Sequence, residues 1–306
     1  MNFQKNVSLK DFSNYKIGGP ARLFVEVFVT EELKDILNSA TSEKVFILGG
    51  GTNVLIDDRG FDGLVIHNKI QGIGIVDGTL EMGGGILIKD LLDFCIENSQ
   101  SGLEWAGGLP GTVAGAVWGN AGAFKGETKD NVLEVRSMDI KTRDEKIRTN
   151  SECEFDYRKS IFKSRANEFI TSVVLGLTLG DKREIKEKIQ QKIDYRINRH
   201  PMDYPNIGST FKNIPLDSLS ESLQREFAPF VKTDPFPVVP TTKLLALAGL
   251  KGRRVGGAMI SDKHPDFIVN LGSAKSDDVK SLIEIAKEAI REKYGIWLEE
   301  EIQYLF

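Results

Sequence analysis

The chain has 306 residues, enough for about two domains of roughly 150 residues each. Its hydrophobic content of 41% and charged content of 27% are ordinary for a soluble globular protein. The formal net charge of -4 argues against a general nucleic-acid-binding protein, which normally has a basic surplus. A local basic pocket for an anionic small molecule remains compatible with this balance.

The N-terminal stretch and the cysteines favour a reducing compartment. Residues 1–12 are polar and lack the apolar core of a secretory signal. No apolar run reaches the roughly 18 residues that a membrane span needs. Cys95 and Cys153 lack metal-type spacing and are interpreted as reduced thiols rather than a disulfide. We therefore expect a cytoplasmic protein with no membrane partner.

In chain order, the first predicted helix is capped by Thr30 and turns apolar residues to one face. A strand over 44–48 then enters a loop of consecutive glycines. Glycine loses the most backbone freedom on folding, so such a loop suits a place where no side chain can separate backbone from ligand. Bare N–H groups in succession suit an anion such as a pyrophosphate. A tight turn with spare glycines is the alternative. The loop consists of Gly49, Gly50, Gly51, Thr52 and Asn53.

Strands are predicted within 64–97, followed by an amphipathic helix near 87–98. Residues 107–122, GGLPGTVAGAVWGNAG, are almost all small. Such a segment suits the close approach of a large planar ligand, and two glycine loops together favour one long dinucleotide. A glycine-rich helix packed on a sheet is the alternative. Neither loop is a P-loop, because the dipeptide Gly-Lys never occurs.

Further strands are predicted over 132–140 and 168–179. A helix over 182–197 places Ile185, Ile189, Ile193 and Ile197 in one stripe. The main domain boundary is placed at residue 200, where a segment rich in proline, asparagine and glycine begins.

Residues 216–240 are interpreted as an insertion with a polar helix and a proline-bearing loop. A helix over 276–291, capped by Ser276, and a strand over 296–306 complete the predicted elements. The apolar stripe of this helix is predicted to consist of Val279, Leu282, Ile283, Ala286 and Ile290. The three histidines are widely spaced, and no metal, Ser-His-Asp or Cys-x-x-Cys motif is present. No metal site is therefore predicted.

Three polar segments remain as candidate chemistry: 157–162 (YRKSIF), 208–213 (GSTFKN) and 299–301 (EEE). A surface ion pair, a turn and a solvated strand edge are their simpler interpretations. Strand alternation puts Glu299 and Glu301 on one face and Glu300 on the other, so one carboxylate could face inward.

Together these segments resemble the family of UDP-N-acetylenolpyruvoylglucosamine reductases (MurB), over roughly residues 10–305. The matching segments are NYKIGGPA (14–21), LGGGTNVLI (48–56), GLPGTVAGAVWGNAGA (108–123), YRKSIF (157–162), GSTFKN (208–213), AGLKGRRVGGAMIS (248–261), HPDFIVN (264–270) and LEEEI (298–302). Their number and order make the resemblance specific.

The resemblance implies an α+β protein with the FAD-binding fold of the vanillyl-alcohol oxidase type. It places two FAD-binding subdomains at 1–66 and 67–199, a substrate-binding domain at 200–295, and a C-terminal strand at 296–306 that returns to the active site. The implied cofactors are noncovalent FAD and NADPH as reductant. The implied FAD-binding residues are Gly49, Gly50, Gly51, Thr52, Asn53, Gly111, Thr112, Gly115, Asn120 and Gly122.

The implied activity is reduction of UDP-N-acetylglucosamine enolpyruvyl ether, a UDP-sugar, to UDP-N-acetylmuramate for peptidoglycan synthesis. Hydride goes from the flavin to C3, Arg158 and Glu301 stabilise the enol, and Ser209 gives a proton to C2. The family's pattern also assigns substrate contacts to Asn213 and His264. Charge alone adds Lys212 and Arg253 as partners of the diphosphate, and a monomer is expected.

The chain departs from the family at three places. Relatives commonly have His-Ala-Asn-Phe where residues 264–267 read His-Pro-Asp-Phe, and an acidic residue where Ala246 stands. The segment 216–240 is longer than in many relatives, and the extra tyrosine-bearing loop of one subtype is missing. The chain is therefore assigned to the shorter subtype.

Two other functions remain open. A flavin oxidase of the same fold with another substrate is disfavoured, because residues 44–63 contain no histidine that could tether the flavin. A nucleotide-sugar-binding protein without catalysis is disfavoured by the presence of Arg158, Ser209 and Glu301.

Overall fold

The computed structural model describes residues 3–41 and 43–306. They form two compact units. The first unit consists of Met1–Val7, Ala21–Gly50 and Asp62–Asp194, and the second of Ser8–Pro20, Gly51–Phe61 and Tyr195–Phe306. The chain thus crosses between units inside the first glycine loop. None of the helices described has both the length and the apolar character needed to span a membrane.

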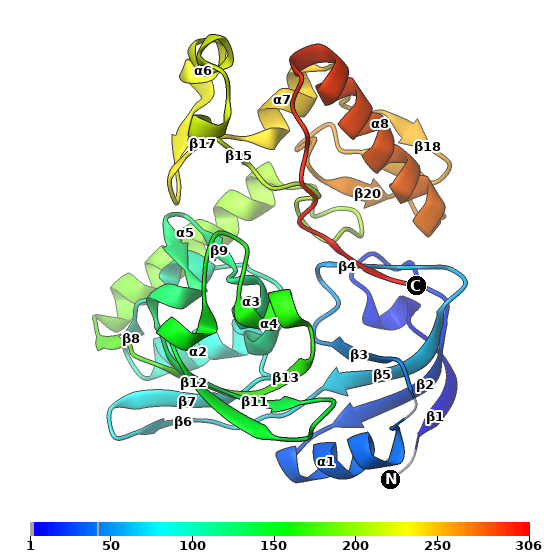
Figure 1. The fold of residues 1–306 in the computed structure, drawn as a ribbon. Coiled ribbons are helices and arrows are strands. Elements are labelled where there is room, and N and C mark those ends of the chain that lie inside the picture. The colour runs from blue at the N-terminus through cyan, green and yellow to red at the C-terminus, as the bar shows by residue number, and fades with distance from the viewer. Residues whose placement is uncertain (1–2, 42) are drawn as a thin grey trace. The chain divides into compact units, whose positions relative to one another are not determined.

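The first unit begins with a four-stranded sheet in the order β1-β2-β5-β3 (Figure 1). Its strands are β1 (Gln4–Ser8), β2 (Pro20–Val27), β5 (Phe61–Asn68) and β3 (Val45–Leu48). Strands β3 and β5 run parallel, with Leu48 opposite His67. Helix α1 (Thr30–Ser39) packs its buried face, Leu33, Ile36 and Leu37, into the core of this sheet. The parallel pair delivers the chain directly into the first glycine loop.

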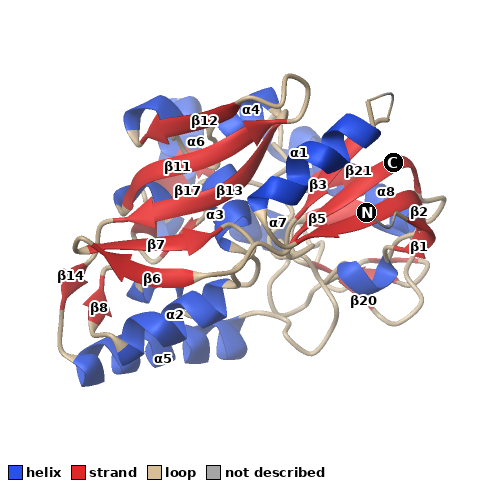
Figure 2. Cartoon of the chain, turned by 90° about the horizontal axis from the view of Figure 1, so that it is seen from below, coloured by secondary structure: helices blue, strands red, loops and turns tan. Residues whose placement is uncertain are grey.

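A five-stranded antiparallel sheet, β12-β11-β13-β7-β6, forms the rest of the first unit (Figure 2). Its strands are β12 (Glu145–Thr149), β11 (Val132–Asp139), β13 (Glu168–Leu175), β7 (Thr79–Gly83) and β6 (Ile73–Val76). The helices that cover one face are α2 (Ile88–Glu97), α3 (Val113–Gly119), α4 (Ile161–Arg165) and α5 (Lys182–Arg199) (Figure 1). Two short pairs, β8 (Gln100–Ser101) with β14 (Thr178–Leu179) and β9 (Gly122–Ala123) with β10 (Gly126–Glu127), complete it.

The second unit is built around helix α8 (Ser276–Tyr294). It packs against the antiparallel sheet β18 (Arg254–Val255), β19 (Ala258–Ile260) and β20 (Ile268–Asn270). The segment 214–247 supplies β15 (Ile214–Pro215), α6 (Glu221–Phe227), β16 (Lys232–Thr233), β17 (Pro237–Val239) and α7 (Thr241–Leu247). The C-terminal strand β21 (Gln303–Leu305), red in Figure 1, pairs in parallel with β4 (Val54–Ile56).

Most predicted elements are confirmed, with corrections at their ends. The buried stripe of α8 is the one expected from its spacing: Val279, Leu282, Ile283, Ala286 and Ile290. Its N-cap, however, is Lys275 rather than Ser276, and the N-cap of α1 is Val29 rather than Thr30. Ile197 was expected in the apolar stripe of α5 but is 53% exposed, so that stripe ends before the last turn. The predicted strand 296–306 is a regular strand only over Gln303–Leu305.

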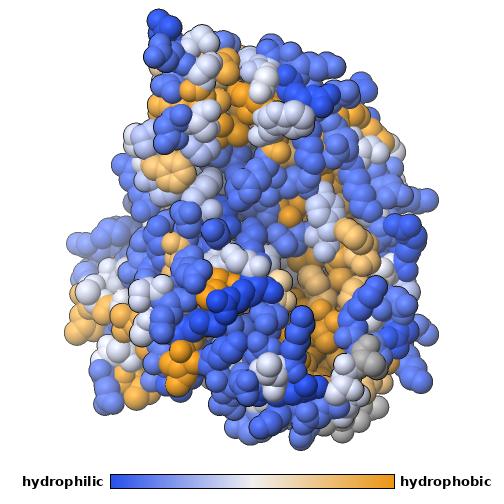
Figure 3. Space-filling model, viewed as in Figure 1, coloured by the Kyte–Doolittle hydropathy of each residue, from blue (hydrophilic) through white to orange (hydrophobic). Residues whose placement is uncertain are grey.

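Figure 3 shows a face dominated by charged and polar residues, with apolar residues in scattered patches. Cys95 and Cys153 are both free and buried, as expected of reduced thiols. Burial raises the pKa of each thiol to about 12, which makes both poor nucleophiles.

Candidate active site

The two predicted glycine loops approach each other inside the first unit. A Cβ atom on Gly50 would lie 2.8 Å from Cα of Gly111, and one on Gly49 would lie 2.8 Å from Oγ1 of Thr112. A side chain at either position would therefore push the loops apart. The second glycine loop is tied to α2, because the Ile88 N–H donates to the Gly111 carbonyl at 3.0 Å.

The remainder of the first glycine loop belongs to the second unit. Gly51 has a φ of +61°, and a Cβ there would overlap the carbonyl oxygen of Phe12. This glycine is thus required by the chain's own packing. In the part of the chain that the structure describes, no acceptor is recorded for the backbone N–H groups of Gly51, Thr52 and Asn53. Backbone donors without partners are uncommon, and successive ones suit an anion.

Helix α3 carries the small residues of the second loop. Thr112 caps it, accepting a hydrogen bond from the Gly115 N–H at 3.3 Å. Gly115 is exposed, and a Cβ there would make only an ordinary contact, whereas one on Gly119 would meet nothing within 4 Å. The protein itself therefore does not require glycine at these two positions. Open space at unforced glycines is what close approach of a flat cofactor demands.

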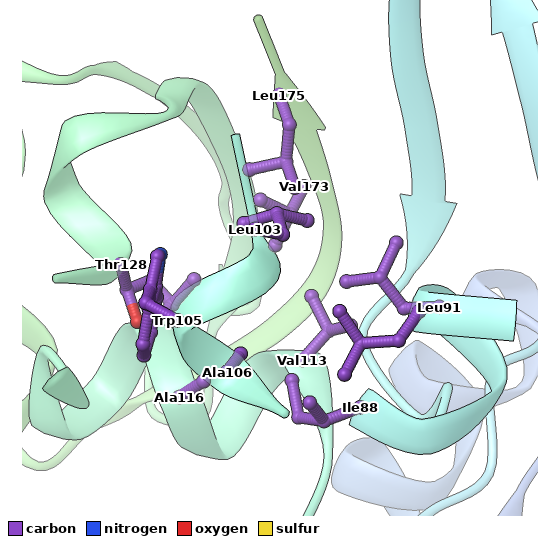
Figure 4. Close-up of a pocket in the computed structure, with 12 residues that line it drawn as sticks. Ile88, Leu91, Leu103, Trp105, Ala106, Val113, Ala116, Thr128, Val173 and Leu175 are labelled. Carbon is purple, nitrogen blue, oxygen red and sulfur yellow. The ribbon is translucent and has the colours of Figure 1, made fainter. Parts of the chain in front are cut away.

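A separate cavity of about 20 Å³ lies beneath α3 in the core of the first unit (Figure 4). Its lining is apolar apart from Thr128, and it includes Ile88, Leu91, Trp105 and Val113. A buried water needs two to four polar partners, so this space is a packing void rather than a ligand site.

Arg158 is presented on a tight turn of the first unit. Asp156 and Lys159 exchange backbone hydrogen bonds of 3.1 and 3.0 Å across the turn, which leaves Tyr157 and Arg158 at its tip. Arg158 has a φ of +54°, in a region that non-glycine residues rarely occupy. Strained backbone of this kind persists only where the surroundings impose it, and it gathers at functional sites.

Two predicted cofactor residues turn out to support this turn. The Gly122 carbonyl accepts a hydrogen bond from the Arg158 guanidinium at 2.8 Å. Asn120 is fully buried, and its amide donates to the Asp156 carbonyl at 2.9 Å and accepts from the Lys129 N–H at 3.0 Å. The side chain of Asn120 is therefore already committed to the protein. The second glycine loop thus borders open space at Gly115 and Gly119, and through Asn120 and Gly122 it holds the Arg158 turn in place.

In the second unit, the segments that carry Ser209 and Glu301 are paired. The Glu301 N–H donates to the Thr210 carbonyl at 2.8 Å, and the Lys212 N–H donates to the Glu299 carbonyl at 2.9 Å. The Asn53 side chain donates to the Glu301 carbonyl at 3.1 Å. Three distant stretches of chain thus place Ser209, Glu301 and the end of the first glycine loop together.

The three glutamates differ in exposure, and Glu299 and Glu300 have different partners. Glu299 is exposed and forms an ion pair with Lys212, a residue expected to hold the diphosphate. Glu300 contacts Lys287 and the Tyr304 hydroxyl. Glu301 is half-buried.

The other predicted substrate residues have different surroundings. The Asn213 side chain accepts the Thr241 N–H at 3.2 Å. His264 packs against the rings of His200 and Phe267, and burial lowers its pKa to about 3. Its buried Nδ1 has no hydrogen-bond partner among the residues described. Arg253 is exposed in the turn before β18, and no recorded contact within residues 3–41 and 43–306 joins it to Ser209 or Glu301.

One residue of this site was not identified from the sequence. The Asp266 carboxyl accepts the Phe211 N–H at 3.0 Å and is hydrogen-bonded to the Ser209 hydroxyl. The only sequence signal was the departure from the family's His-Ala-Asn-Phe pattern, which gave no position for the side chain.

Comparisons with known proteins show the family of the chain and the fold of its domains. Residues 21–144 match a model of an FAD binding domain, and residues 200–305 match the C-terminal domain of UDP-N-acetylenolpyruvoylglucosamine reductase. Curated reductases of that name are 36% identical in Caldicellulosiruptor bescii, over 99% of this chain and 90% of the relative, and 37% identical in Pseudothermotoga lettingae, over 96% and 95%. The crystal structure of the reductase (MurB) from Thermus caldophilus covers all of both chains, with a TM-score of 0.79 and 30% identity.

These matches confirm the predicted α+β fold with an FAD-binding domain followed by a C-terminal domain. The similarity extends along the whole chain and includes both units. The chain belongs to the UDP-N-acetylenolpyruvoylglucosamine reductase family.

Proposed function

We propose that this protein is an NADPH-dependent flavoenzyme that reduces UDP-N-acetylglucosamine enolpyruvyl ether to UDP-N-acetylmuramate, a precursor of peptidoglycan. Family membership gives the activity its support. The observation that carries the assignment of residues is the pairing of the Ser209 and Glu301 segments, since it joins a proton donor to a carboxylate in one site.

The residues present fit a noncovalent FAD. Thr52 and Asn53 offer N–H groups without recorded acceptors, which suits a pyrophosphate. Gly115 leaves the approach to α3 open. When bound and reduced by NADPH, the flavin supplies the hydride that adds to C3 of the enolpyruvyl group.

Arg158 stabilises the negative charge that this addition creates. Hydride brings its electron pair to C3, and the electrons of the C2=C3 bond move onto C2 and the adjacent carboxylate as an enolate. A fixed cation lowers the energy of that charge without having to reorganise. The hydrogen bond to the Gly122 carbonyl and the strained turn hold the guanidinium in place.

Ser209 completes the reaction by giving its proton to C2, where the electron pair of the enolate accepts it. Glu301 acts with Arg158 on the enol. Lys212, Asn213, Arg253 and His264 are the proposed substrate contacts, with the lysine and arginine directed to the diphosphate. His264 stays neutral at physiological pH because burial lowers its pKa, so it offers a hydrogen bond rather than a charge.

The test is the variant Ser209→Ala, with Ser209→Cys as the matched control that keeps an acidic proton. Enzyme reduced beforehand with NADPH is mixed rapidly with substrate deuterated at C3, and reoxidation is followed by flavin absorbance. We expect steeply reduced turnover for the alanine variant, more activity for the cysteine variant, and loss of deuterium as the trapped enol reverts. Turnover of Ser209→Ala near the wild-type rate, without label loss, would remove Ser209 from the mechanism.

A further inference from the structure

The Asp266 carboxyl is enclosed by the loop that carries Ser209. Asp266 is only 3% exposed, and its Oδ1 accepts the Phe211 N–H at 3.0 Å. The Thr210 N–H donates to the Asp266 backbone carbonyl at 2.7 Å, which fixes the two loops to each other. The Ser209 hydroxyl is hydrogen-bonded to the same carboxyl. Asp266 and Ser209 therefore form a rigid pair.

No cation is paired with this carboxyl in the described part of the chain. Burial, with the nearby charge of Glu301, raises the pKa of Asp266 well above its ordinary value. On its own loop, His264 has a lowered pKa and brings no positive charge. The surroundings thus favour the neutral acid.

The protonation state of the carboxyl decides the direction of the contact with Ser209. Oδ1 is an acceptor, because Phe211 donates to it, so the proton of the neutral acid resides on Oδ2. The carboxylate accepts from the Ser209 hydroxyl, whereas in the neutral state the carboxyl can donate to the Ser209 oxygen. The hydrogen of Ser209 is then free to point elsewhere.

We propose that Asp266 is the positioning residue of the proton donor: its carboxyl donates a hydrogen bond to Oγ of Ser209 and so directs the Ser209 hydrogen toward C2 of the substrate. This rests on the proposed role of Ser209. In the step itself the Ser209 O–H bond breaks, the C2–H bond forms, and the oxygen keeps the electron pair. The hydrogen bond from Asp266 stabilises that alkoxide until a proton from water restores the hydroxyl.

The arrangement has a defined pH sign. As pH rises through the raised pKa of Asp266, the carboxylate becomes an acceptor and draws the Ser209 hydrogen to itself. A second negative charge also appears beside Glu301 and the developing enolate. The proton-transfer step therefore slows at high pH and is unaffected at lower pH. An asparagine amide placed the same way accepts from Phe211 and donates to Ser209, without ever ionising.

The experiment compares Asp266→Asn and Asp266→Ala in the full-length, FAD-loaded enzyme. Reoxidation of the pre-reduced flavin by substrate is measured at pH values from about 6 to about 10. We expect Asp266→Asn to retain most of the neutral-pH rate and to lose the decline at high pH. We expect Asp266→Ala to be slower by roughly 10- to 100-fold at all pH values, the kinetic equivalent of one lost hydrogen bond.

Two results would overturn the proposal. One is an Asp266→Asn enzyme that keeps the wild-type decline at high pH. The other is an Asp266→Asn enzyme as slow as Asp266→Ala, which would mean that the acid proton itself is consumed. If Asp266→Ala does not fold, the asparagine variant alone decides.

A double variant separates this inference from the role of Ser209. If Asp266 acts through Ser209, adding Asp266→Asn to Ser209→Ala changes neither the residual rate nor its pH dependence. A further pH effect in the double variant contradicts positioning. A fast Ser209→Ala enzyme instead contradicts the proposed function itself, so the two failures are distinguishable.

Discussion

The Arg158 turn and the Ser209 loop solve the same problem, holding one polar group still, by different means. Arg158 is fixed by its own Asp156–Lys159 turn and by the 120–122 segment, 36 residues earlier in the chain. Ser209 is fixed by long-range packing, for Phe211 and Asp266 are 55 residues apart and Asn53 and Glu301 are 248 apart.

The difference lies in where the free-energy cost falls. The turn concentrates it on one strained residue, whose left-handed backbone costs about 1–2 kcal/mol. The loop places it in a buried carboxyl without a cation. In the proposed mechanism, the firmly held Arg158 cation suits stabilisation of negative charge. The buried acid Asp266 suits delivery of a proton through Ser209. Four variants test the roles proposed for the residues of this site.

Arg158→Ala is expected to have the largest effect. Reoxidation of the reduced flavin by substrate should slow by roughly 10²–10³, the usual cost of one oxyanion-type donor. Reduction by NADPH should be largely retained, and rapid-mixing absorbance separates the two half-reactions. Comparable losses in both would mean that Arg158 supports the fold rather than the enolate.

Gly115→Leu should weaken FAD binding by about tenfold or more. The leucine side chain would overpack the space beside the bound cofactor, at a cost of about 1–3 kcal/mol. The unfolding free energy of the apoprotein should not fall, because a Cβ here meets only an ordinary contact and leucine favours helix. Flavin fluorescence titration measures the affinity. Gly74→Leu in β6, where a Cβ also meets nothing, is the control, and equal weakening there would contradict the assignment. Gly51→Val is a poorer test, since it overlaps Phe12 before any ligand is considered.

Arg158→Gly should be more stable than Arg158→Ala by about 1 kcal/mol, because only glycine occupies this φ without strain. Both variants should be equally inactive toward the enolpyruvyl substrate. Urea unfolding measures the difference. If the two variants are equally stable, the Arg158 turn is not strained, and its backbone does not carry the free-energy cost assigned to it above.

Lys212→Met should change the unfolding free energy by less than about 1 kcal/mol, since its partner Glu299 is largely exposed and screened by solvent. Its effect should appear as a higher KM for the UDP-sugar with little change in kcat. Glu299→Gln removes the same ion pair and is the control. A matching rise in KM for Glu299→Gln would show that the pair, and not a contact with the diphosphate, matters.

The sequence was informative where a property depends on neighbours in the chain. The stripe of α8 follows from its spacing, and Arg158, Ser209 and Glu301 stand in motifs that could be matched one at a time. It was uninformative where tertiary structure decides. Asp266 and Ser209 come into contact only through folding. Asn120 was predicted to bind the cofactor, and only the structure shows the contacts of its side chain with Asp156 and Lys129. The helix caps at Val29 and Lys275 depend on backbone angles that propensity does not fix.

The pairing of β21 with β4 has a consequence for biosynthesis. Everything in the first unit is translated by Asp194, whereas Glu301 and strand β21, which pairs with β4, follow much later in the chain. At typical elongation rates the delay is on the order of ten seconds. The Arg158 turn can therefore form while the nascent chain is still growing. The pairing of the Ser209 loop with the Glu301 segment forms only later, and until β21 has been made β4 lacks its partner strand.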